Sequence, residues 1–331
     1  MMAGKVVVSQ FTGAFAKLNG STDITATRAD IIRSLLTVGY PSPKKAIRTV
    51  GPWRTRMLSA MAYGYLDRAL RTTEYFRNLE QTEKAGVSFL FGQAFTHWFA
   101  QERMGIPFLL HVAGLASTTW GSSSAAVTPK TGASAPSPKS RPDFIGVKKA
   151  ESHVFESKGR IRRPALSAVG KALGQVSALR SVNGAQPTTR CATFFVLKAS
   201  GAEGRVIDPE GEASGVKVEF DEWEMVTKVY SFFLDGENVD LADATGEGYV
   251  GREVEPGIYF GIDEKVLRVV AGPGPASASE RQQRMDEMFG ILSHRAIDYR
   301  ERRTEEVSPG PDGMLLIDRR QGGIRPRRKK A

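Results

Sequence analysis

Three residues that could bind a metal ion beside a phosphate lie close together near the middle of the chain. Asp143 directly precedes the apolar run 144–147, and Glu156 and Lys158 follow the β-prone residues 153–155. Carboxylates are the oxygen ligands that Mg²⁺ prefers, and its remaining positions can be filled by a phosphate. An ammonium group nearby can offset the negative charge of that phosphate. The three residue types therefore indicate metal-assisted chemistry on a phosphate ester.

The elements that must position these residues are two short strands. The runs 144–147 and 153–155 have strand length, and the polar residues 148–152 between them predict a hairpin loop. Because side chains alternate along a strand, the three residues share a face only if the numbers of two residues paired across the hairpin add up to an odd number. Asp143 opposite Glu156, or opposite Lys158, is such a pairing. A pairing whose numbers add up to an even number would put Asp143 on the face opposite Glu156 and Lys158.

Pro142-Asp143, followed about a dozen residues later by Glu156-Ser157-Lys158, resembles the signature of the PD-(D/E)xK (restriction-endonuclease-like) nuclease superfamily. That superfamily has a core of helix, three strands, helix and strand, and the same order can be read from about 86 to 200. The resemblance implies that Asp143, Glu156 and the backbone carbonyl of Ser157 bind Mg²⁺ or Mn²⁺, with Lys158 as the third catalytic residue. It implies cleavage of DNA, in restriction, repair or antiviral defence.

Further residues are candidates for the same site or its substrate. Glu102 continues the apolar stripe of the helix predicted over 86–104, where it is either a surface acid or the extra acid that superfamily members often carry on this helix. Lys171 and Gln175 share one face of a later helix; such residues reach the active site in some branches, although a solvated face is the simpler interpretation. Arg160, Arg162 and Arg163 follow Lys158 and are expected to contact nucleic acid.

The apolar pattern predicts an α/β protein in four parts. Residues 1–80 are expected to be helical after a strand at 5–9, with an amphipathic stripe at 31–36 and a second helix from Pro43, a weak helix-turn-helix pattern. Residues 81–200 form the nuclease-like core. Its predicted parts are a helix at 86–104, a strand at 106–115 that contains a core histidine, His111, a flexible loop at 118–140, a helix at 164–182 with a buried stripe from Leu166 to Leu179, and a strand at 190–198.

The C-terminal part is predicted to be a small acidic, β-rich module over 201–278, with strands at 228–234, 257–262 and 265–270. A charged helix at 279–303 and a basic tail, 325–330, complete the chain. The tail is expected to contact phosphates without reading sequence.

Charge is distributed unevenly along the 331 residues. The first 190 carry a net +16, residues 191–278 carry −10, and the remainder carries +4, for a total of +10. A basic half favours a polyanion such as DNA as partner, whereas the acidic module could dock a protein partner such as a helicase or ATPase. The alternative to a nuclease is a non-catalytic DNA-binding or scaffold subunit that retains the fold.

The single cysteine, Cys191, excludes an intramolecular disulfide and fits a reducing compartment. No stretch reaches 18 uninterrupted apolar residues, and the N-terminus lacks the apolar core of a signal peptide. A soluble, cytoplasmic protein without a membrane partner is therefore expected, and its oligomeric state stays open.

Overall fold

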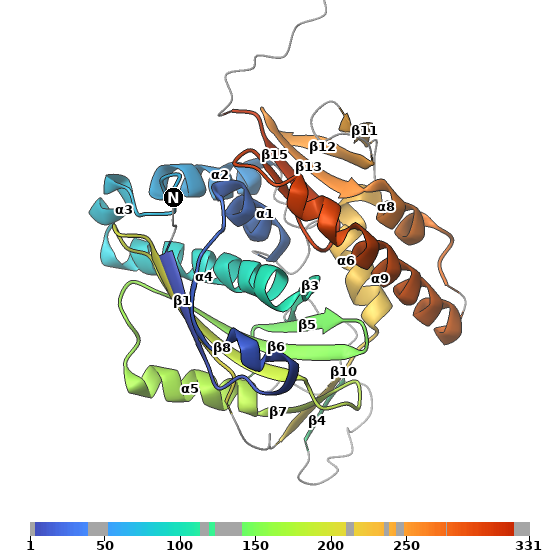
Figure 1. Ribbon diagram of the computed structural model, residues 1–331, viewed down its shortest axis with the longest axis horizontal. Helices are drawn as coiled ribbons and strands as arrows, with labels where there is room; N and C mark the ends of the chain where they lie inside the picture. Colours follow the sequence, from blue (N-terminus) through green and yellow to red (C-terminus); the bar gives the residue numbers. More distant parts are fainter. Residues whose placement is uncertain are drawn as a thin grey trace, which may run out of the picture.

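The computed structural model describes residues 4–38, 52–112, 119–122, 141–209, 215–234, 238–242, 248–275 and 277–320. The second predicted N-terminal helix at Pro43, most of the predicted loop 118–140 and the basic tail 325–330 lie outside these residues. The protein is a mixed α/β protein (Figure 1). No helix among the described residues combines the length and apolar content that crossing a membrane requires.

A seven-stranded mixed sheet forms the centre of the molecule, with the strand order β2-β1-β9-β8-β6-β5-β3 (Figure 1). The pairs β1/β9 and β6/β8 are parallel, and the other neighbours are antiparallel. The strands are β1 (Gly4–Ser9), β2 (Gly20–Asp23), β3 (Phe108–His111), β5 (Phe144–Lys148), β6 (Glu151–Arg160), β8 (Thr189–Val196) and β9 (Ala202–Ile207). Cys191 lies in the central strand β8 and is fully buried.

Helix α4 (Gln81–Met104) covers one face of this sheet, and α5 (Leu166–Ser177) covers the opposite face (Figure 1). A capping box of Glu80 and Glu83 starts α4, and Gly105 ends it in the left-handed conformation, with φ of 66°. The apolar residues expected on the helix do face the core, where Phe95 stacks on Phe195 of β8 with 5.2 Å between ring centroids. The predicted helix 86–104 is confirmed and begins five residues earlier.

Two glycines let α4 lie directly on β6. A Cβ atom added to Gly159 would overlap the carbonyl oxygen of Ser88, and one added to Gly92 would overlap the backbone of Gly159. The helix and the strand therefore touch through their backbones at this crossing.

The N-terminal region is completed by α1 (Arg28–Val38), α2 (Pro52–Tyr65), α3 (Glu74–Asn78) and a 3-10 helix, η1 (Gly13–Leu18). Helix α1 packs on the outer side of α4 (Figure 1). The predicted strand at 5–9 and the stripe at 31–36 are confirmed. This region is more than helical, however, because β1 and β2 extend the central sheet.

A second sheet has the order β11-β12-β13-β15-β14 and carries helices α6, α8 and α9 (Figure 1). Its strands are β11 (Val239–Asp240), β12 (Tyr249–Glu255), β13 (Ile258–Asp263), β14 (Val307–Pro309) and β15 (Met314–Asp318). The helices are α6 (Glu222–Leu234), α8 (Glu264–Ala271) and α9 (Ala278–Glu301). A third, small sheet joins β4 (Thr119–Ser122), β10 (Val216–Glu219) and β7 (Leu179–Val182).

Two predicted strands in the C-terminal part are wrong, since 228–234 and 265–270 are helical. In α6 the buried residues recur at helical spacing, as Val226, Tyr230 and Phe233 do, and in α8 Val266 and Val270 are four apart. The side chain of Asp263 caps α8 by accepting a hydrogen bond from the Lys265 amide at 2.8 Å.

Four details of the predicted core also differ. The helix predicted over 164–182 ends at Ser177, because 179–182 pair with β10 as strand β7. Its first turn leaves Leu166 85% exposed, so the buried face consists of Val169, Ala172 and Val176. Within the predicted loop, residues 119–122 form β4. The boundary expected near 200 separates no sheets, because β9 pairs with both β8 and β1.

Candidate active site

The hairpin of β5 and β6 places the predicted residues on one face of the sheet. Phe144 pairs with Phe155 and Lys148 pairs with Glu151, so the partner numbers have the odd sum that a shared face requires. One step beyond the last pair, Asp143 lies opposite Glu156. Lys158 follows Glu156 by two positions and so points to the same side.

Asp143 is fixed at the start of β5 by hydrogen bonds to both neighbouring strands. Its Oδ2 accepts a bond from the amide of Ser157 at 2.9 Å, and its backbone carbonyl accepts one from the amide of Val112 at 2.9 Å. The carboxylate is therefore held across the gap between β5 and β6, beside Glu156.

Glu156 is a fully buried carboxylate that is only partly neutralised. Its Oε1 pairs with Nζ of Lys158, but its Oε2 has no hydrogen-bond donor among the described residues. Burial, and then the nearby Asp143 carboxylate, raise the pKa of Glu156 to about 7. An ionised oxygen buried without a partner is costly, so this atom favours a cation as an additional ligand.

A cluster of buried hydroxyl groups supports Glu156 from beneath. The Thr193 hydroxyl donates to the backbone carbonyl of Glu156 at 3.0 Å, and lies 2.6 Å from the Thr96 hydroxyl. Thr96 also donates to the Ser157 hydroxyl at 3.0 Å. These residues come from α4, β6 and β8, and no local motif links them, so the sequence alone does not predict the cluster.

The donor set around Asp143 and Glu156 fits a magnesium or manganese ion. Among the described residues there is no group of three or more His, Cys, Asp or Glu side chains that could hold a metal. Mg²⁺ is nevertheless commonly held by one or two carboxylates, with water and substrate phosphates as the other ligands. The two carboxylates and the unpartnered Oε2 of Glu156 are compatible with that type of site.

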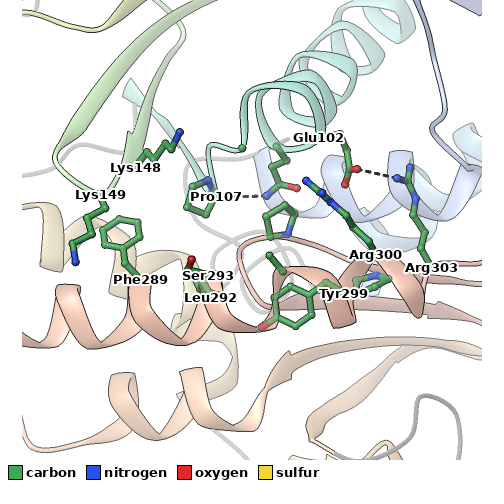
Figure 2. Close-up of a pocket in the computed structure, with 15 residues that line it drawn as sticks. Glu102, Pro107, Lys148, Lys149, Phe289, Leu292, Ser293, Tyr299, Arg300 and Arg303 are labelled. Carbon is green, nitrogen blue, oxygen red and sulfur yellow. Dashed lines mark hydrogen bonds and ion pairs between the residues drawn. The ribbon is translucent and has the colours of Figure 1, made fainter. Parts of the chain in front are cut away.

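Glu102 is not brought to these residues. Its carboxylate binds Nη1 of Arg303 at 3.0 Å, in a cavity between the end of α4, the β5–β6 turn and α9 (Figure 2). Helix α4 contacts the face of β6 that carries Ser157, whereas Glu156 points to the opposite face. The expectation that Glu102 joins the metal site is thus not met, because its ion pair lies on the other side of the sheet.

The helical candidates Lys171 and Gln175 lie on α5, which covers the face of the sheet opposite α4 (Figure 1). Because α4 contacts the Ser157 face of β6, this is the face of Glu156. Lys171 is exposed and Gln175 is half-buried. Neither makes a hydrogen bond or an ion pair with Asp143, Glu156 or Lys158 in the part of the chain that the structure describes.

The three predicted nucleic-acid contacts extend away from Lys158. Arg160 shares the face of Glu156 and Lys158, and its buried Nε has no partner among the described residues. Arg162 and Arg163 are exposed, and Nη2 of Arg163 binds Glu203 at 3.2 Å. A basic path therefore leads from the end of β6 toward β9.

His111, expected in the core, lies half-buried at the end of β3, next to the candidate site. Its ring packs on Phe144 with 5.0 Å between centroids. Burial lowers the pKa of His111, while the Asp143 carboxylate acts in the opposite direction. The neutral imidazole is therefore favoured, and the sequence held no signal that would place it beside Asp143.

Comparison of the chain with protein-family models, curated proteins and solved structures found no match. The geometry of the site therefore carries the functional proposal.

Proposed function

We propose that this protein is a metal-dependent nuclease that cleaves DNA phosphodiester bonds. The observation that carries the proposal is the buried Glu156, whose unpartnered Oε2 lies beside a second carboxylate, Asp143, and an ammonium group, Lys158. A purely structural ion pair needs only one carboxylate for each lysine, whereas here two carboxylates, Asp143 and Glu156, lie together with the single Lys158. The additional, unsatisfied negative charge favours a divalent cation.

The arrangement of elements supports the resemblance to the PD-(D/E)xK superfamily. The chain runs α4, β3, β5, β6, α5 and β8 through this region, with the additional short strands β4 and β7 in another sheet. This is the expected order of helix, three strands, helix and strand. Strands β3, β5 and β6 are antiparallel, and β8 returns parallel to β6 after the crossover through α5.

The carboxylates of Asp143 and Glu156 would hold Mg²⁺ or Mn²⁺. The amide of Ser157 points to Asp143, and the N–H and C=O of a strand residue point the same way. The Ser157 carbonyl therefore faces this gap, where it would be a further ligand. A bound ion supplies charge neutralisation of the phosphate and a water of lowered pKa.

Lys158 offsets negative charge on the scissile phosphate. Its ammonium group already contacts Glu156 and is one quarter exposed, so it can reach toward a substrate that approaches the two carboxylates. Electrostatic stabilisation of this kind acts where charge develops in the transition state.

The test is cleavage of plasmid and of labelled DNA with Mg²⁺ or Mn²⁺, compared with EDTA. Asp143→Ala, Glu156→Ala and Lys158→Ala should each reduce the rate by about 100-fold or more, with melting temperatures that show an intact fold. Glu102→Gln is the matched control, because α4, which carries Glu102, packs on the other face of the sheet. This variant should cleave at the wild-type rate.

Wild-type cleavage by Glu156→Ala would refute the site. A wild-type protein that binds DNA but cleaves none with either metal would favour the alternative, a non-catalytic DNA-binding or scaffold subunit. Replacing Arg160, Arg162 and Arg163 together by Ala should weaken DNA binding across sequences and make it less dependent on salt.

A further inference from the structure

A groove of about 710 Å³ lies on the central sheet, on the face that also carries Glu156 and Lys158. It is lined by β1, β8 and β9, by Ser21 of β2, and by Arg163 and Pro164 just before α5. Of these strands, β8 belongs to the four-stranded part that carries the candidate active site, whereas β1, β2 and β9 lie outside it. The groove therefore extends beyond the candidate active site and could bind a different part of the substrate.

The pairing of the strands connects this groove to the active site. Lys158 pairs with Phe194, Phe194 with Arg205, and Arg205 with Val7, so the four residues form one row across the sheet. All members of this row except Lys158 line the groove. The groove floor is thus the continuation of the row that begins with Lys158.

A second row runs beside the first. Arg160 pairs with Val196, Val196 with Glu203, and Glu203 with Lys5, and again every member after the β6 residue lines the groove. Neighbouring strands are about 4.8 Å apart, so Lys158 and Arg205, two strands apart, are separated by roughly 10 Å. A chain that leaves the active site past Arg160 can therefore reach the groove within a few nucleotides.

The groove combines free cations with apolar surface. Lys5 and Arg205 are exposed and have no ion-pair or hydrogen-bond partner in the described part of the chain. Val7 is 51% exposed on the floor, and Pro164, Phe194 and Val196 complete the apolar lining.

One carboxylate, Glu203, lies among these residues, and it is already neutralised. Lys198 binds it at 2.6 Å and Arg163 binds it at 3.2 Å, and these contacts lower the pKa of Glu203. The lining cations Lys5, Arg163 and Arg205 outnumber this one carboxylate, so the groove has a net positive charge that suits a polyanion.

On the basis of the proposed nuclease function, we propose that this groove binds a single-stranded segment of the nucleic-acid substrate as it leaves the active site. Cations beside apolar surface match a single strand, which offers phosphates and unpaired bases together. A duplex keeps its bases stacked inside and would present only its sugar-phosphate surface to the apolar floor.

The test uses a fluorescent 12-nucleotide oligo(dT) and a duplex of equal length, with the full chain in EDTA. Lys5→Gln combined with Arg205→Gln should weaken binding of the single strand by 10-fold or more. It should also reduce the slope of log K against log salt by about 1.4, as expected for the loss of two phosphate contacts. Glu203→Gln releases Arg163 and Lys198 and should strengthen binding.

The matched control combines Lys265→Gln with Arg268→Gln, which removes the same charge from exposed positions of α8. The proposal is overturned if this pair weakens oligo(dT) binding as much as the groove pair does. It is also overturned if the groove pair weakens duplex binding equally. Loss of cleavage by Glu156→Ala tests the nuclease separately, because binding in EDTA requires no catalysis.

Discussion

Glu156 combines two properties that normally exclude each other, complete burial and a charge that Lys158 only partly neutralises. Burial and the Asp143 carboxylate hold its pKa at about 7, above the ordinary value of 4.5. From pH 4.5 to 7 the folded protein therefore retains a proton that the unfolded chain has lost. By linkage, the free energy of unfolding falls as the pH rises through this window and stays level above it.

Glu156→Gln should remove this penalty. Relative to wild type, the variant should gain roughly 2 to 4 kcal/mol in free energy of unfolding between pH 4.5 and pH 8 in EDTA, because each unit of pKa shift corresponds to about 1.4 kcal/mol. Denaturant unfolding of both proteins at several pH values measures the difference. Asp208, whose pKa burial raises to about 6, contributes equally to both proteins and cancels.

Mn²⁺ added at pH 8 should stabilise the wild type and leave Glu156→Gln nearly unchanged, since binding to the folded state alone raises stability. A difference between the two proteins that does not vary with pH would contradict the burial argument.

At this scale, the sequence predicted that Asp143, Glu156 and Lys158 could share one face of a hairpin, because alternation limits the possible registers to two classes, and the register of β5 and β6 confirms the shared face. Their role in catalysis stays a prediction. Glu102 could not be placed, because its partner Arg303 lies 201 residues away along the chain.

The backbone contact between α4 and β6 determines how the helix lies on the sheet. It depends on Gly92 and Gly159, where any side chain would meet backbone atoms that cannot move separately. The same crossing brings Thr96 to Ser157, next to Glu156.

Gly159→Ala should therefore destabilise the protein by more than about 3 kcal/mol or prevent folding, as overpacking against backbone does. Gly174→Ala is the matched control: this helical glycine in α5 has open space around it, and alanine should stabilise by about 0.5 to 1 kcal/mol. Thermal melting of the two variants measures the expected loss of stability in Gly159→Ala and the expected gain in Gly174→Ala. A neutral Gly159→Ala would show that α4 can shift away from β6.

Single helices and strands can be predicted where one face is continuously apolar, as in α4 and β8. Which strands pair with each other cannot be predicted, because the pairing of β1 with β9 joins residues about 200 positions apart and no local sequence pattern marks it. The end of helix α6 is wrongly predicted as a strand, because the short apolar run 228–234 does not distinguish a helical from a strand period.

A buried polar network joins the two sheets into one molecule. Arg33 of α1 is fully buried and donates to Ser308 at 2.9 Å and to Gln101 of α4 at 2.7 Å. Beside it, Asp30 accepts hydrogen bonds from Ser308 at 2.6 Å and from Nε of Arg303 at 2.9 Å. The network thus ties α1 and α4 to the C-terminal strands.

Asp30→Ala should cost about 3 to 5 kcal/mol, because it leaves Arg303 and Ser308 without their shared acceptor. Arg268→Ala breaks only an exposed pair with Glu264 and should cost less than about 1 kcal/mol. Denaturant unfolding followed by tryptophan fluorescence and by circular dichroism provides the comparison. If the two sheets form one cooperative unit, both probes should give the same midpoint in wild type; separate midpoints would show independent domains.

Because the only cysteine is buried, its reaction with a thiol reagent can measure how often the core around it opens. Cys191 lies in the central strand, its thiol is inaccessible, and burial raises its pKa well above the ordinary value, so the folded protein should be inert to thiol reagents. Labelling by an aromatic disulfide reagent then occurs only when β8 separates from α4 and exposes the thiol. The labelling rate at low reagent concentration gives the free energy of that opening without an engineered probe.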